Sequence, residues 1–478
     1  MITLRLGEIA AAVRGVVVGD PDRTVTGVVT DSRRASSEAL FVALRGETAD
    51  GHQFVAGAQR DRGAAALVER NDVLQDAGVV VEDCWQAIGA LGAYVRTQVD
   101  PDVVAITGSV GKTTTKDLLR AVLAADRPTV AARGSFNNEL GVPLTLLATE
   151  AGTRALIVEI GARGQGHIAS LTPWVRPDVS IVTAVAGAHL EMFGDLDGVA
   201  AAKGELVAAL AADGIAVLHA DDPRVWAMRA RTEAQVIGYG VRDTDVTVAD
   251  ARVGDDGRWS GRLVTPWGEA SVTMPVPGRH NLSNALAAAA AAGALGVPLG
   301  TIVEGLAGAT LSPFRAALTT RADGLLVVND AYNANPFSME AALDMLSDLR
   351  RPAGRVVAVL GFMAELGQTE VHDHEQIGAR AGTVADLVVV VGSHPALAGM
   401  AAAAEATGVE VLTADAPRHV ATALRGRLGA HDVVLCKGSR SAGLDAAAAA
   451  LVADDTPRND RQRPLLHLPR DTTLEAHP

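Results

Sequence analysis

The segment VVAITGSVGKTTTKDLL, residues 103–119, decides the fold of this chain. Its Val/Ile-rich start, residues 103–107, is typical of a buried strand, and the residues from Lys112 onward have the apolar spacing of a helix. Between them lies the pattern G-x-x-G-K-T, from Gly108 to Thr113. A strand, a glycine-rich turn and a helix in this order predict a phosphate-binding loop.

The chemistry of this loop follows from its residue types. Glycine lets backbone N–H groups turn toward a phosphate, and the helix N-terminus adds the positive end of its dipole. The lysine can reach the β- and γ-phosphates, and the next hydroxyl can ligate Mg²⁺. Ile106 stands where the general pattern has its first glycine, so the loop is a shortened form. The alternative is a glycine turn capped by an exposed lysine. The predicted nucleotide ligands here are Gly108, Ser109, Val110, Gly111, Lys112, Thr113 and Thr114.

Short apolar runs alternate with longer Ala/Leu-rich stretches through most of the chain, which predicts an α/β protein with parallel, doubly wound sheets. One set of runs begins at residues 103, 155, 179 and 215, and a second at 325, 356, 387, 409 and 432. The stretch before them is mixed and turn-rich. We therefore expect an N-terminal domain (1–98), a central P-loop domain (99–313) and a C-terminal domain (314–478), whose polar tail starts at about residue 454.

The composition excludes several classes of protein. The 478 residues carry a formal net charge of −14, which argues against a nucleic-acid partner. Cys84 and Cys436 are too few for a disulfide framework or a cysteine-based metal site. The start predicts a short strand and a helix rather than a signal peptide, and no stretch has the length of a membrane span. We expect a cytoplasmic protein with no membrane insertion.

Further motifs follow the loop in a fixed order. They are GSFNNELGVPLTLL at Gly134, EIGARGQGHIASL at Glu159, AHLEMFG at Ala188, AAKGEL at Ala201, PGRHNLSNALAAAA at Pro277, NDAYNANPFSM at Asn329, LGFMAELG at Leu360 and CKGSRSAGLD at Cys436. Together with DSRR at Asp31, this set resembles the Mur ligases across all three expected domains. The FNNE-G-P-LTLL and DAYNANP-x-SM segments are the most specific, and they are similar to the member that adds a dipeptide rather than a single amino acid.

The resemblance implies a fold and a reaction. It implies an N-terminal domain for the UDP end of the substrate, a central ATP domain and a Rossmann-like C-terminal domain that closes over the site. It also implies that ATP phosphorylates the carboxylate of UDP-N-acetylmuramoyl-tripeptide, and that the amine of D-alanyl-D-alanine attacks the acyl phosphate. The products would be the pentapeptide precursor, ADP and phosphate. We expect a monomer.

The catalytic and metal residues come from the same resemblance. It implies that Glu159 and Thr113 hold one Mg²⁺, that His189 helps to hold a second, and that Lys203 is carbamylated and so anionic. Two anions meet in the reaction, so the cation of Lys112 is also needed. Burial and nearby cations favour the neutral amine that carbamylation requires. Taken alone, Glu159 is also compatible with a solvated acid at the end of a strand. His189 and Lys203, taken alone, are compatible with structural roles.

The remaining ligands are spread over all three domains. The nucleotide set implied by the resemblance adds His280, Asn281, Asn284, Arg315, Asp330 and Tyr332. The substrate set comprises Ser32, Arg33, Asn137, Asn138, Asn333, Asn335, Lys437, Ser439 and Arg440. Alternatives remain: helix capping for Asn281, a turn stabilised by Asp31, and a solvated basic loop for residues 437–440.

The sequence departs from the family pattern at several positions. Phe362 replaces the usual acid of LG-[D/E]-M-x-ELG, which puts in doubt a contact of that acid with the substrate amine. Arg163 and Gly164 replace a commoner Asn-His pair, and Ala184 replaces a frequent Asn. The other hypotheses are an amide ligase that adds a single amino acid or glutamate to folate, a P-loop switch or motor, and a non-catalytic ATP-binding scaffold.

Overall fold

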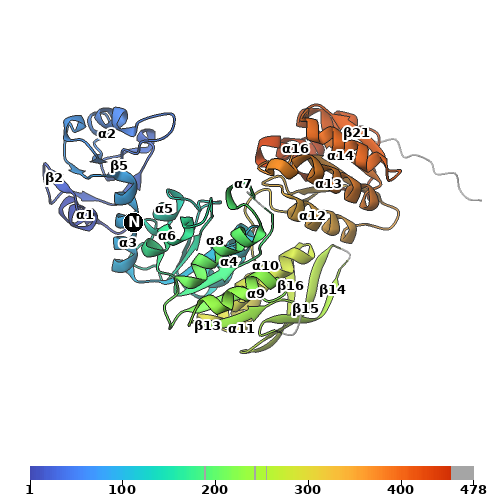
Figure 1. Cartoon of the computed structure of the whole chain (residues 1–478), viewed down its shortest axis with the longest axis horizontal. Helices are drawn as coiled ribbons and strands as arrows, with labels where there is room; N and C mark the ends of the chain where they lie inside the picture. Colours follow the sequence, from blue (N-terminus) through green and yellow to red (C-terminus); the bar gives the residue numbers. More distant parts are fainter. Residues whose placement is uncertain (188–189, 242–243, 255, 454–478) are drawn as a thin grey trace, which may run out of the picture.

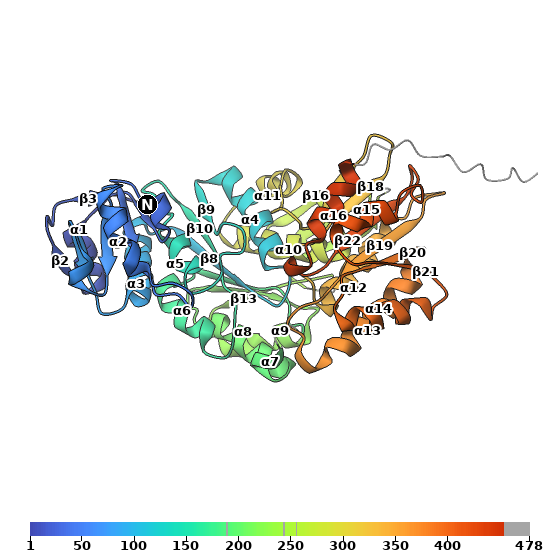
Figure 2. The same cartoon turned by 90° about the horizontal axis from the view of Figure 1, so that it is seen from above.

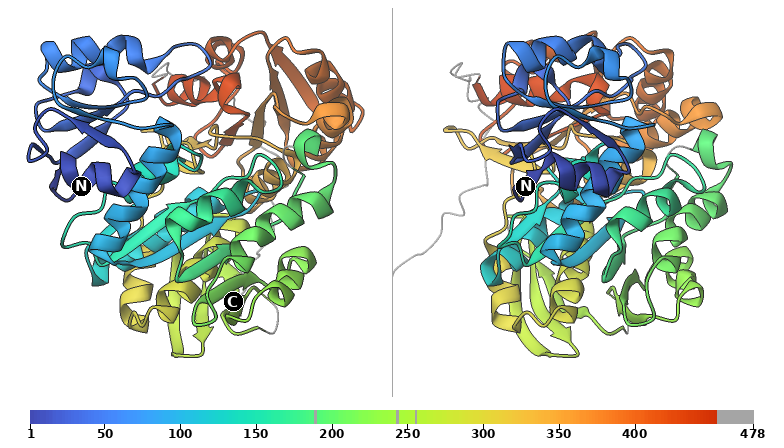
Figure 3. Two further views of the ribbon diagram at one scale, coloured as in Figure 1. Left: turned by 60° about the vertical axis from the view of Figure 1, so that its left-hand side comes forward. Right: turned by 90° about the vertical axis from the view of Figure 1, so that its left-hand side faces the viewer.

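A computed structural model describes residues 1–187, 190–241, 244–254 and 256–453. The N-terminal part (blue) and the C-terminal part (orange to red) lie at opposite ends of the central part (Figures 1 and 2). Both lie above the central part when the molecule is turned (Figure 3, left). The expected α/β fold in three domains is confirmed. The boundaries after residues 98 and 313 stay predictions, and the expected tail from about 454 lies outside the described residues.

The N-terminal part is a small sheet covered by helices. Its five strands have the order β2-β7-β6-β5-β4, and β1 pairs with β3 in a separate ribbon. The strands are β1 (Leu4–Arg5), β2 (Val16–Val18), β3 (Thr24–Val25), β4 (Gly27–Val29), β5 (Ala39–Val42), β6 (Ala65–Val68) and β7 (Gly78–Val80). The helices are α1 (Leu6–Val13), α2 (Val55–Arg60) and α3 (Cys84–Val99), with the 3-10 turns η1 (Ser32–Arg34), η2 (Gly51–Phe54) and η3 (Asn71–Val73). The expected first strand and helix are confirmed.

The central sheet has six parallel strands in the order β13-β12-β11-β8-β10-β9. They are β8 (Asp102–Thr107), β9 (Thr129–Ala131), β10 (Ala155–Glu159), β11 (Val179–Val182), β12 (Ile215–His219) and β13 (Gln235–Tyr239). The helices are α4 (Lys112–Asp126), α5 (Gly141–Leu146), α6 (His167–Val175), α7 (Leu190–Phe193), α8 (Leu196–Ala208), α9 (Pro223–Ala227), η4 (Met228–Arg231), α10 (Arg279–Ala294) and α11 (Leu299–Ala307). A three-stranded antiparallel sheet, β14 (Thr247–Val253), β15 (Arg258–Thr265) and β16 (Gly268–Pro277), lies beside them.

Side chains of successive residues in β8 enter two different cores, because strand side chains alternate between faces. Val104 and Ile106 pack with α4 and the alanine-rich α10, whereas Val103 and Ala105 pack with α5 and α6. Burial on both faces explains why the strand is a continuous apolar run. The loop that follows β8 therefore emerges at the carboxyl edge of the sheet, where parallel α/β folds bind ligands.

The C-terminal sheet has the order β17-β18-β22-β19-β20-β21, and β17 is its antiparallel strand. The strands are β17 (Ala317–Thr320), β18 (Leu326–Asn329), β19 (Val356–Gly361), β20 (Leu387–Val391), β21 (Glu410–Ala414) and β22 (Val433–Lys437). The helical elements are α12 (Pro336–Asp348), η5 (Gly367–Thr369), α13 (Glu370–Val384), α14 (Pro395–Glu405), η6 (Pro417–His419), α15 (Val420–Ala423), η7 (Arg440–Ala442) and α16 (Leu444–Ala453). Within the described part of the chain, no helix has the length and apolar character needed to cross a membrane.

Candidate active site

The predicted phosphate loop joins β8 to α4, and its two glycines have backbone angles that suit only glycine. Gly108 has φ 150° and Gly111 has φ 84°. A Cβ at Gly108 would overlap the hydroxyl of Thr183, and one at Gly111 would overlap the side chain of Asn284. Lys112 begins the helix, and its Nζ donates to the carbonyl oxygen of Gly108 at 2.7 Å. The lysine thus folds back over the loop, where a phosphate would lie.

Thr113 and Glu159 lie side by side behind the loop. The Thr113 hydroxyl donates to Glu159 Oε2 at 2.9 Å, and the Asn137 amide donates to Glu159 Oε1 at 2.8 Å. Glu159 is the last residue of β10 and is 1% exposed, so it is a buried strand-end carboxylate rather than a solvated one. A carboxylate and a hydroxyl oxygen at this separation match the oxygen donors that Mg²⁺ prefers.

A cavity of about 320 Å³, here called the P-loop cavity, extends from this loop to the C-terminal part. It contains most of the predicted nucleotide ligands. They are Ser109, Val110, Gly111, Lys112, Thr113, Thr114, His280, Asn281, Asn284, Arg315, Asp330 and Tyr332, and the predicted metal ligand Glu159 lines the cavity with them. Asn333, Asn335 and Lys437, predicted to bind the other substrates, also line this cavity. The structure therefore brings segments from three places in the sequence around one space.

The C-terminal part reaches the loop through Arg315. Its guanidinium donates to the Thr113 hydroxyl at 3.2 Å and lies 4.1 Å above the ring centre of Tyr332. The neighbouring residues Phe314 and Ala316 have φ angles of 64° and 49°, which are uncommon for residues other than glycine. The linker is therefore bent on both sides of the arginine, and this bend directs its side chain to the loop. The Tyr332 hydroxyl also hydrogen-bonds Ser135.

The first turn of α10 forms the far wall of the P-loop cavity. The Asn281 amide donates to the Pro277 carbonyl at 2.7 Å, and the Asn284 amide donates to Asn281 Oδ1 at 3.2 Å. These two amides thus hold each other and the helix start in place. His280 precedes them, and burial lowers the pKa of its imidazole, so the ring is neutral near pH 7. A neutral imidazole has one donor and one acceptor, which suits recognition of a purine edge.

The basic residues of the last motif have partners inside the C-terminal part. Lys437 Nζ donates to Asp330 Oδ2 at 2.6 Å and to the Asn333 carbonyl at 3.0 Å. Arg440 lies 4.7 Å above the ring centre of Phe314 and pairs with an aspartate of α16. Ser439 and Arg440 are not among the residues that line the described cavities. Their predicted contact with substrate stays a prediction.

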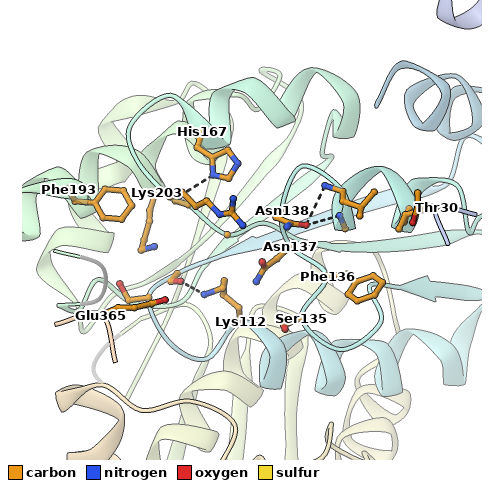
Figure 4. A pocket seen from close by; sticks show the side chains of 18 of the residues that line it. Thr30, Lys112, Ser135, Phe136, Asn137, Asn138, His167, Phe193, Lys203 and Glu365 are labelled. Atoms are coloured by element: carbon orange, nitrogen blue, oxygen red, sulfur yellow. Dashed lines mark hydrogen bonds between the residues drawn. The ribbon is translucent and has the colours of Figure 1, made fainter. Parts of the chain in front are cut away.

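A second and larger cavity, about 590 Å³, lies on the other side of the loop (Figure 4). All three parts of the chain contribute to this large cavity. Its lining includes Thr30, Arg34, Gly108, Ser109, Lys112, Ser135, Phe136, Asn137, Asn138, Leu144, Arg163, His167, Phe193, Lys203 and Glu365. The predicted residues Asn137 and Asn138 are among them. Asn138 Oδ1 also accepts from the Gly141 N–H at 2.9 Å and so holds the start of α5.

Lys203 lies on α8 and is only 5% exposed. Burial lowers the pKa of its amine to about 7, and the positive charge of Lys112 acts in the same direction. No described carboxylate offsets this shift. The amine therefore has a large neutral fraction at neutral pH, and a neutral amine is a nucleophile. His189, the predicted metal ligand, lies outside the described residues.

In the DSRR segment, the arginine that lines a cavity is Arg34 and not the predicted Arg33. Ser32 and Arg33 line none of the described cavities, whereas Thr30 and Arg34 line two of them. Arg33 is bound to Asp31 at 2.8 Å, and this pairing lowers the pKa of the Asp31 carboxyl to about 2. The segment is the 3-10 turn η1, in which neighbouring side chains point about 120° apart. Arg34 therefore faces the cavity while Arg33 faces solvent.

Sequence reasoning missed several residues of the large cavity. Phe136 and Leu144 belong to the FNNE segment, and Glu365 belongs to LGFMAELG, so their motifs were recognised without their roles. His167 belongs to EIGARGQGHIASL, a motif that was likewise recognised without this residue's role. Arg163, noted as a departure from the family pattern, lies in this cavity beside His167. Phe362 packs instead against His374 and His394, with ring centres 5.1 Å and 4.1 Å apart.

This fold and this site define a class of protein: an ATP-dependent enzyme in which a phosphate loop of the central domain meets side chains of two other domains. Comparison with known sequences agrees. The profile of the Mur ligase family catalytic domain matches residues 24–103, the Mur ligase middle domain residues 106–292, and the Mur ligase glutamate ligase domain residues 315–440. The chain belongs to the Mur ligase family.

Two relatives illustrate how far the likeness extends. The chain is 37% identical to the UDP-N-acetylmuramoyl-tripeptide–D-alanyl-D-alanine ligase of Escherichia coli, over 95% of this chain and 100% of that one. It is 39% identical to the Mycobacterium tuberculosis enzyme of the same name, over 95% of this chain and 99% of that one.

Two solved structures show the same fold. The structure of MurF from Acinetobacter baumannii superposes with a TM-score of 0.86 at 33% identity, and covers 94% of this chain and 99% of that one. The MurF ligase of Thermotoga maritima was solved in complex with ADP. It superposes with a TM-score of 0.80 at 29% identity, and covers 89% of this chain and 96% of that one.

Proposed function

We propose that this chain joins D-alanyl-D-alanine to UDP-N-acetylmuramoyl-tripeptide at the expense of ATP, in peptidoglycan synthesis. The main support is that the chain spans the full length of relatives that carry this name. The two cavities give the proposal a physical basis. The P-loop cavity has the backbone of a phosphate site, and the large cavity adjoins it and is lined by basic groups.

The reaction divides between the two cavities. The terminal carboxylate of the tripeptide attacks the γ-phosphorus of ATP, and ADP leaves, which gives an acyl phosphate. The amine of the dipeptide then attacks the acyl carbon, phosphate leaves and the nitrogen loses a proton. Lys112 and Arg315 lie where they can bind the phosphates from two sides, which offsets the repulsion between two anions. Arg34 and Arg163 can bind the anionic groups of the tripeptide substrate.

Thr113 and Glu159 fit a Mg²⁺ ion, because their oxygens are 2.9 Å apart and adjoin the loop. Mg²⁺ takes few protein ligands and completes its shell with phosphates and water. When bound, it would neutralise charge on the β- and γ-phosphates. Asn137 holds the second oxygen of Glu159 and so fixes the orientation of the carboxylate. A second ion, with His189 among its ligands, is part of the same proposal.

Lys203 is proposed to carry a carbamate. A free ammonium in the large cavity would be buried and would add to the charge of Lys112, and both effects lower the pKa of the Lys203 amine, burial more than the charge. CO₂ reacts with the neutral amine, and the product bears a negative charge that suits a cation-rich site. We further propose that the chain acts as a monomer in the cytoplasm, since one copy of the chain supplies the lining of both cavities.

The test is to mix the purified chain with Mg·ATP, the UDP-linked tripeptide and D-Ala-D-Ala, and to follow phosphate release and product mass together. We expect phosphate release that needs both substrates, and a pentapeptide product. Product formed with a single amino acid instead of the dipeptide would identify another amide ligase of the family. ATP hydrolysis at the same rate with and without the two substrates would favour a P-loop switch. ATP binding without hydrolysis would favour a non-catalytic scaffold.

A further inference from the structure

The P-loop cavity has groups that suit the edge of a purine base. His280, Asn281 and Asn284 belong to the start of α10 and line this cavity. Their side chains carry donors and acceptors of the kind that pair with the nitrogens at the edge of a base. A bound base also has two flat faces, and aromatic side chains stack on such faces. A base site in this cavity therefore needs an aromatic ring that is open to a ligand.

Phe337 is the ring that meets this requirement. It lines the P-loop cavity and is 47% exposed, so a large apolar side chain lies open there. None of the described residues places another ring or a cationic group over it. Two other rings of the cavity have a face covered. His219 stacks on Tyr239 with ring centres 4.9 Å apart, and the Arg315 guanidinium lies over Tyr332. Phe337 is therefore the aromatic side chain best placed to stack on a ligand.

Helix α12 brings Phe337 close to the start of α10, and the two helices lie next to each other (Figure 1). Phe337, Ala341 and Met345 are spaced four apart and so follow one side of α12. Met345 packs against the start of α10, since a Cβ at Gly278 would lie 3.3 Å from its Cγ. Ala341 and Phe337 come one and two turns earlier, and both line the cavity. Because Ala341 is small, space for a flat group remains between the ring and α10.

The first turn of α12 gives this ring a fixed position. Asn335 and Ser338 form a capping box on either side of Phe337, with hydrogen bonds of 2.9 and 3.0 Å between the side chain of each and the N–H of the other. Pro336 is the first residue of the helix, where its fixed φ angle suits the helical backbone. A ring that is already positioned loses little conformational entropy when a ligand binds.

We propose that Phe337 stacks on the adenine base of ATP and so raises the affinity of this chain for the nucleotide. This inference rests on the proposed function, in which ATP occupies the P-loop cavity with its phosphates at Lys112. The motif DAYNANP-x-SM leaves residue 337 open, so the stack is a property of this chain. The competing role is an apolar contact with D-alanyl-D-alanine, because Asn333 and Asn335 of the same segment were predicted to bind the other substrates.

The test is the Phe337→Ala variant of the full chain, with the Kd of two ligands measured by calorimetry in the presence of Mg²⁺. The ligands are ATP and ribose 5-triphosphate, which has the same phosphates and sugar but no base. We expect the Kd for ATP to rise about 5- to 100-fold, as for the loss of one base–aromatic stack. The Kd for ribose 5-triphosphate should stay within about twofold of the wild-type value. The Tm should equal that of wild type, because the ring is exposed.

Two further variants separate stacking from apolar contact in general. Phe337→Leu keeps an apolar side chain without a flat ring, and it should lose most of the same affinity for ATP. Phe337→Trp keeps a flat ring and should retain the affinity, and ATP but not ribose 5-triphosphate should quench the added indole emission. Phe54→Ala is the matched control, because Phe54 is 45% exposed and lines none of the described cavities. Its Kd values for both ligands should equal those of wild type.

The outcomes separate the inference from the proposed function. An unchanged Kd for ATP in Phe337→Ala, or an equal loss of affinity for ribose 5-triphosphate, overturns the inference while the ligase activity stands. A raised KM for D-Ala-D-Ala with an unchanged Kd for ATP assigns the ring to the dipeptide and overturns it as well. A wild-type chain that binds ATP but forms no pentapeptide overturns the proposed function alone. Loss of affinity for ATP only, retained by tryptophan and not by leucine, establishes the stack.

Discussion

The two cavities share the phosphate loop but are built in different ways. The P-loop cavity is made of short continuous segments, 109–114 and 280–284 from the central domain and 330–338 from the C-terminal domain. The large cavity takes residues of the segments 108–109, 135–141 and 161–163 and is completed by single side chains from distant elements, such as Arg34, Lys203 and Glu365. Docking of the C-terminal domain therefore completes both cavities, whereas the N-terminal domain contributes to the large cavity alone.

This difference separates the general chemistry from the choice of substrate. A phosphate site needs glycine turns and a helix start, which any P-loop protein provides. The large cavity needs side chains from three domains at the same time. Changes at the loop and at Lys203 should therefore lower turnover, whereas changes at the other side chains of the large cavity should alter the affinity for one substrate at a time.

The largest effect is expected for Lys112→Ala. Its Nζ folds over the loop and donates to the Gly108 carbonyl, and we expect it to bind phosphate in the complex. Its loss should lower kcat for substrate-dependent phosphate release by about 10³-fold or more, because it removes a preorganised charge from the transition state. Arg120→Ala is the control, since Arg120 is exposed on the same helix. A decrease of less than about tenfold for Lys112→Ala would contradict the assignment of the loop as the catalytic phosphate site.

A smaller effect is expected at Lys203, in the large cavity. Lys203→Ala should lower kcat about 100-fold, and added acetate should restore part of it, because a small carboxylate can replace the carbamate. Wild type should lose activity in CO₂-free buffer and regain it with bicarbonate.

The pH dependence of this CO₂ effect has a defined sign. Burial lowers the pKa of the Lys203 amine to about 7, so the neutral amine prevails above that pH and the ammonium below it. Carbamate forms from the neutral amine. Stimulation by bicarbonate should therefore be strong at about pH 8 and weak at about pH 6. Wild-type activity that is the same with and without CO₂, together with a loss in Lys203→Ala that acetate does not restore, would show that the lysine has only a structural role.

The fold was largely predictable because its buried strands are continuous apolar runs. The antiparallel sheet β14–β16 was not predicted, since its strands are half-exposed and the second half of β14 is exposed to solvent. β17 was missed for the same reason. Periodicity is a weak signal where a strand has little to bury.

The P-loop cavity was predictable because its ligands follow one another in the sequence. Of the predicted loop residues, Gly108 lines the large cavity instead. The choice between Arg33 and Arg34 depends on the direction of a 3-10 turn, and the placement of Glu365 depends on how the C-terminal domain docks. Neither placement can be predicted from the neighbouring residues in the sequence alone. The roles of the site residues stay predictions until they are measured.

The arginine pair of η1 tests the placement directly. Arg34→Ala removes a side chain that lines the large cavity, and we expect the KM for the UDP-linked tripeptide to rise about tenfold. Arg33→Ala should leave that KM within about twofold, since Arg33 is 85% exposed and paired with Asp31. Each variant is the control for the other. The reverse order of effects would support the sequence-based choice of Arg33.

The smallest effect is expected at Asn335, which was predicted to bind substrate and which lines the P-loop cavity. Its side-chain oxygen accepts from the Ser338 N–H at 2.9 Å, and the Ser338 hydroxyl accepts from the Asn335 N–H at 3.0 Å. This pair caps α12, so Asn335→Ala should lower the free energy of unfolding by about 1 kcal/mol. Asn335→Ser keeps a capping oxygen and should recover most of that loss.

Thermal unfolding of both Asn335 variants, together with their KM values, decides between the two roles. A cap predicts a lower Tm for the alanine variant alone, and KM values within about twofold of wild type for both. A substrate ligand predicts a raised KM for D-Ala-D-Ala in both variants with little change in Tm. In that case the short segment 330–338 would bind the dipeptide as well as the nucleotide. The two cavities would then not bind separate substrates.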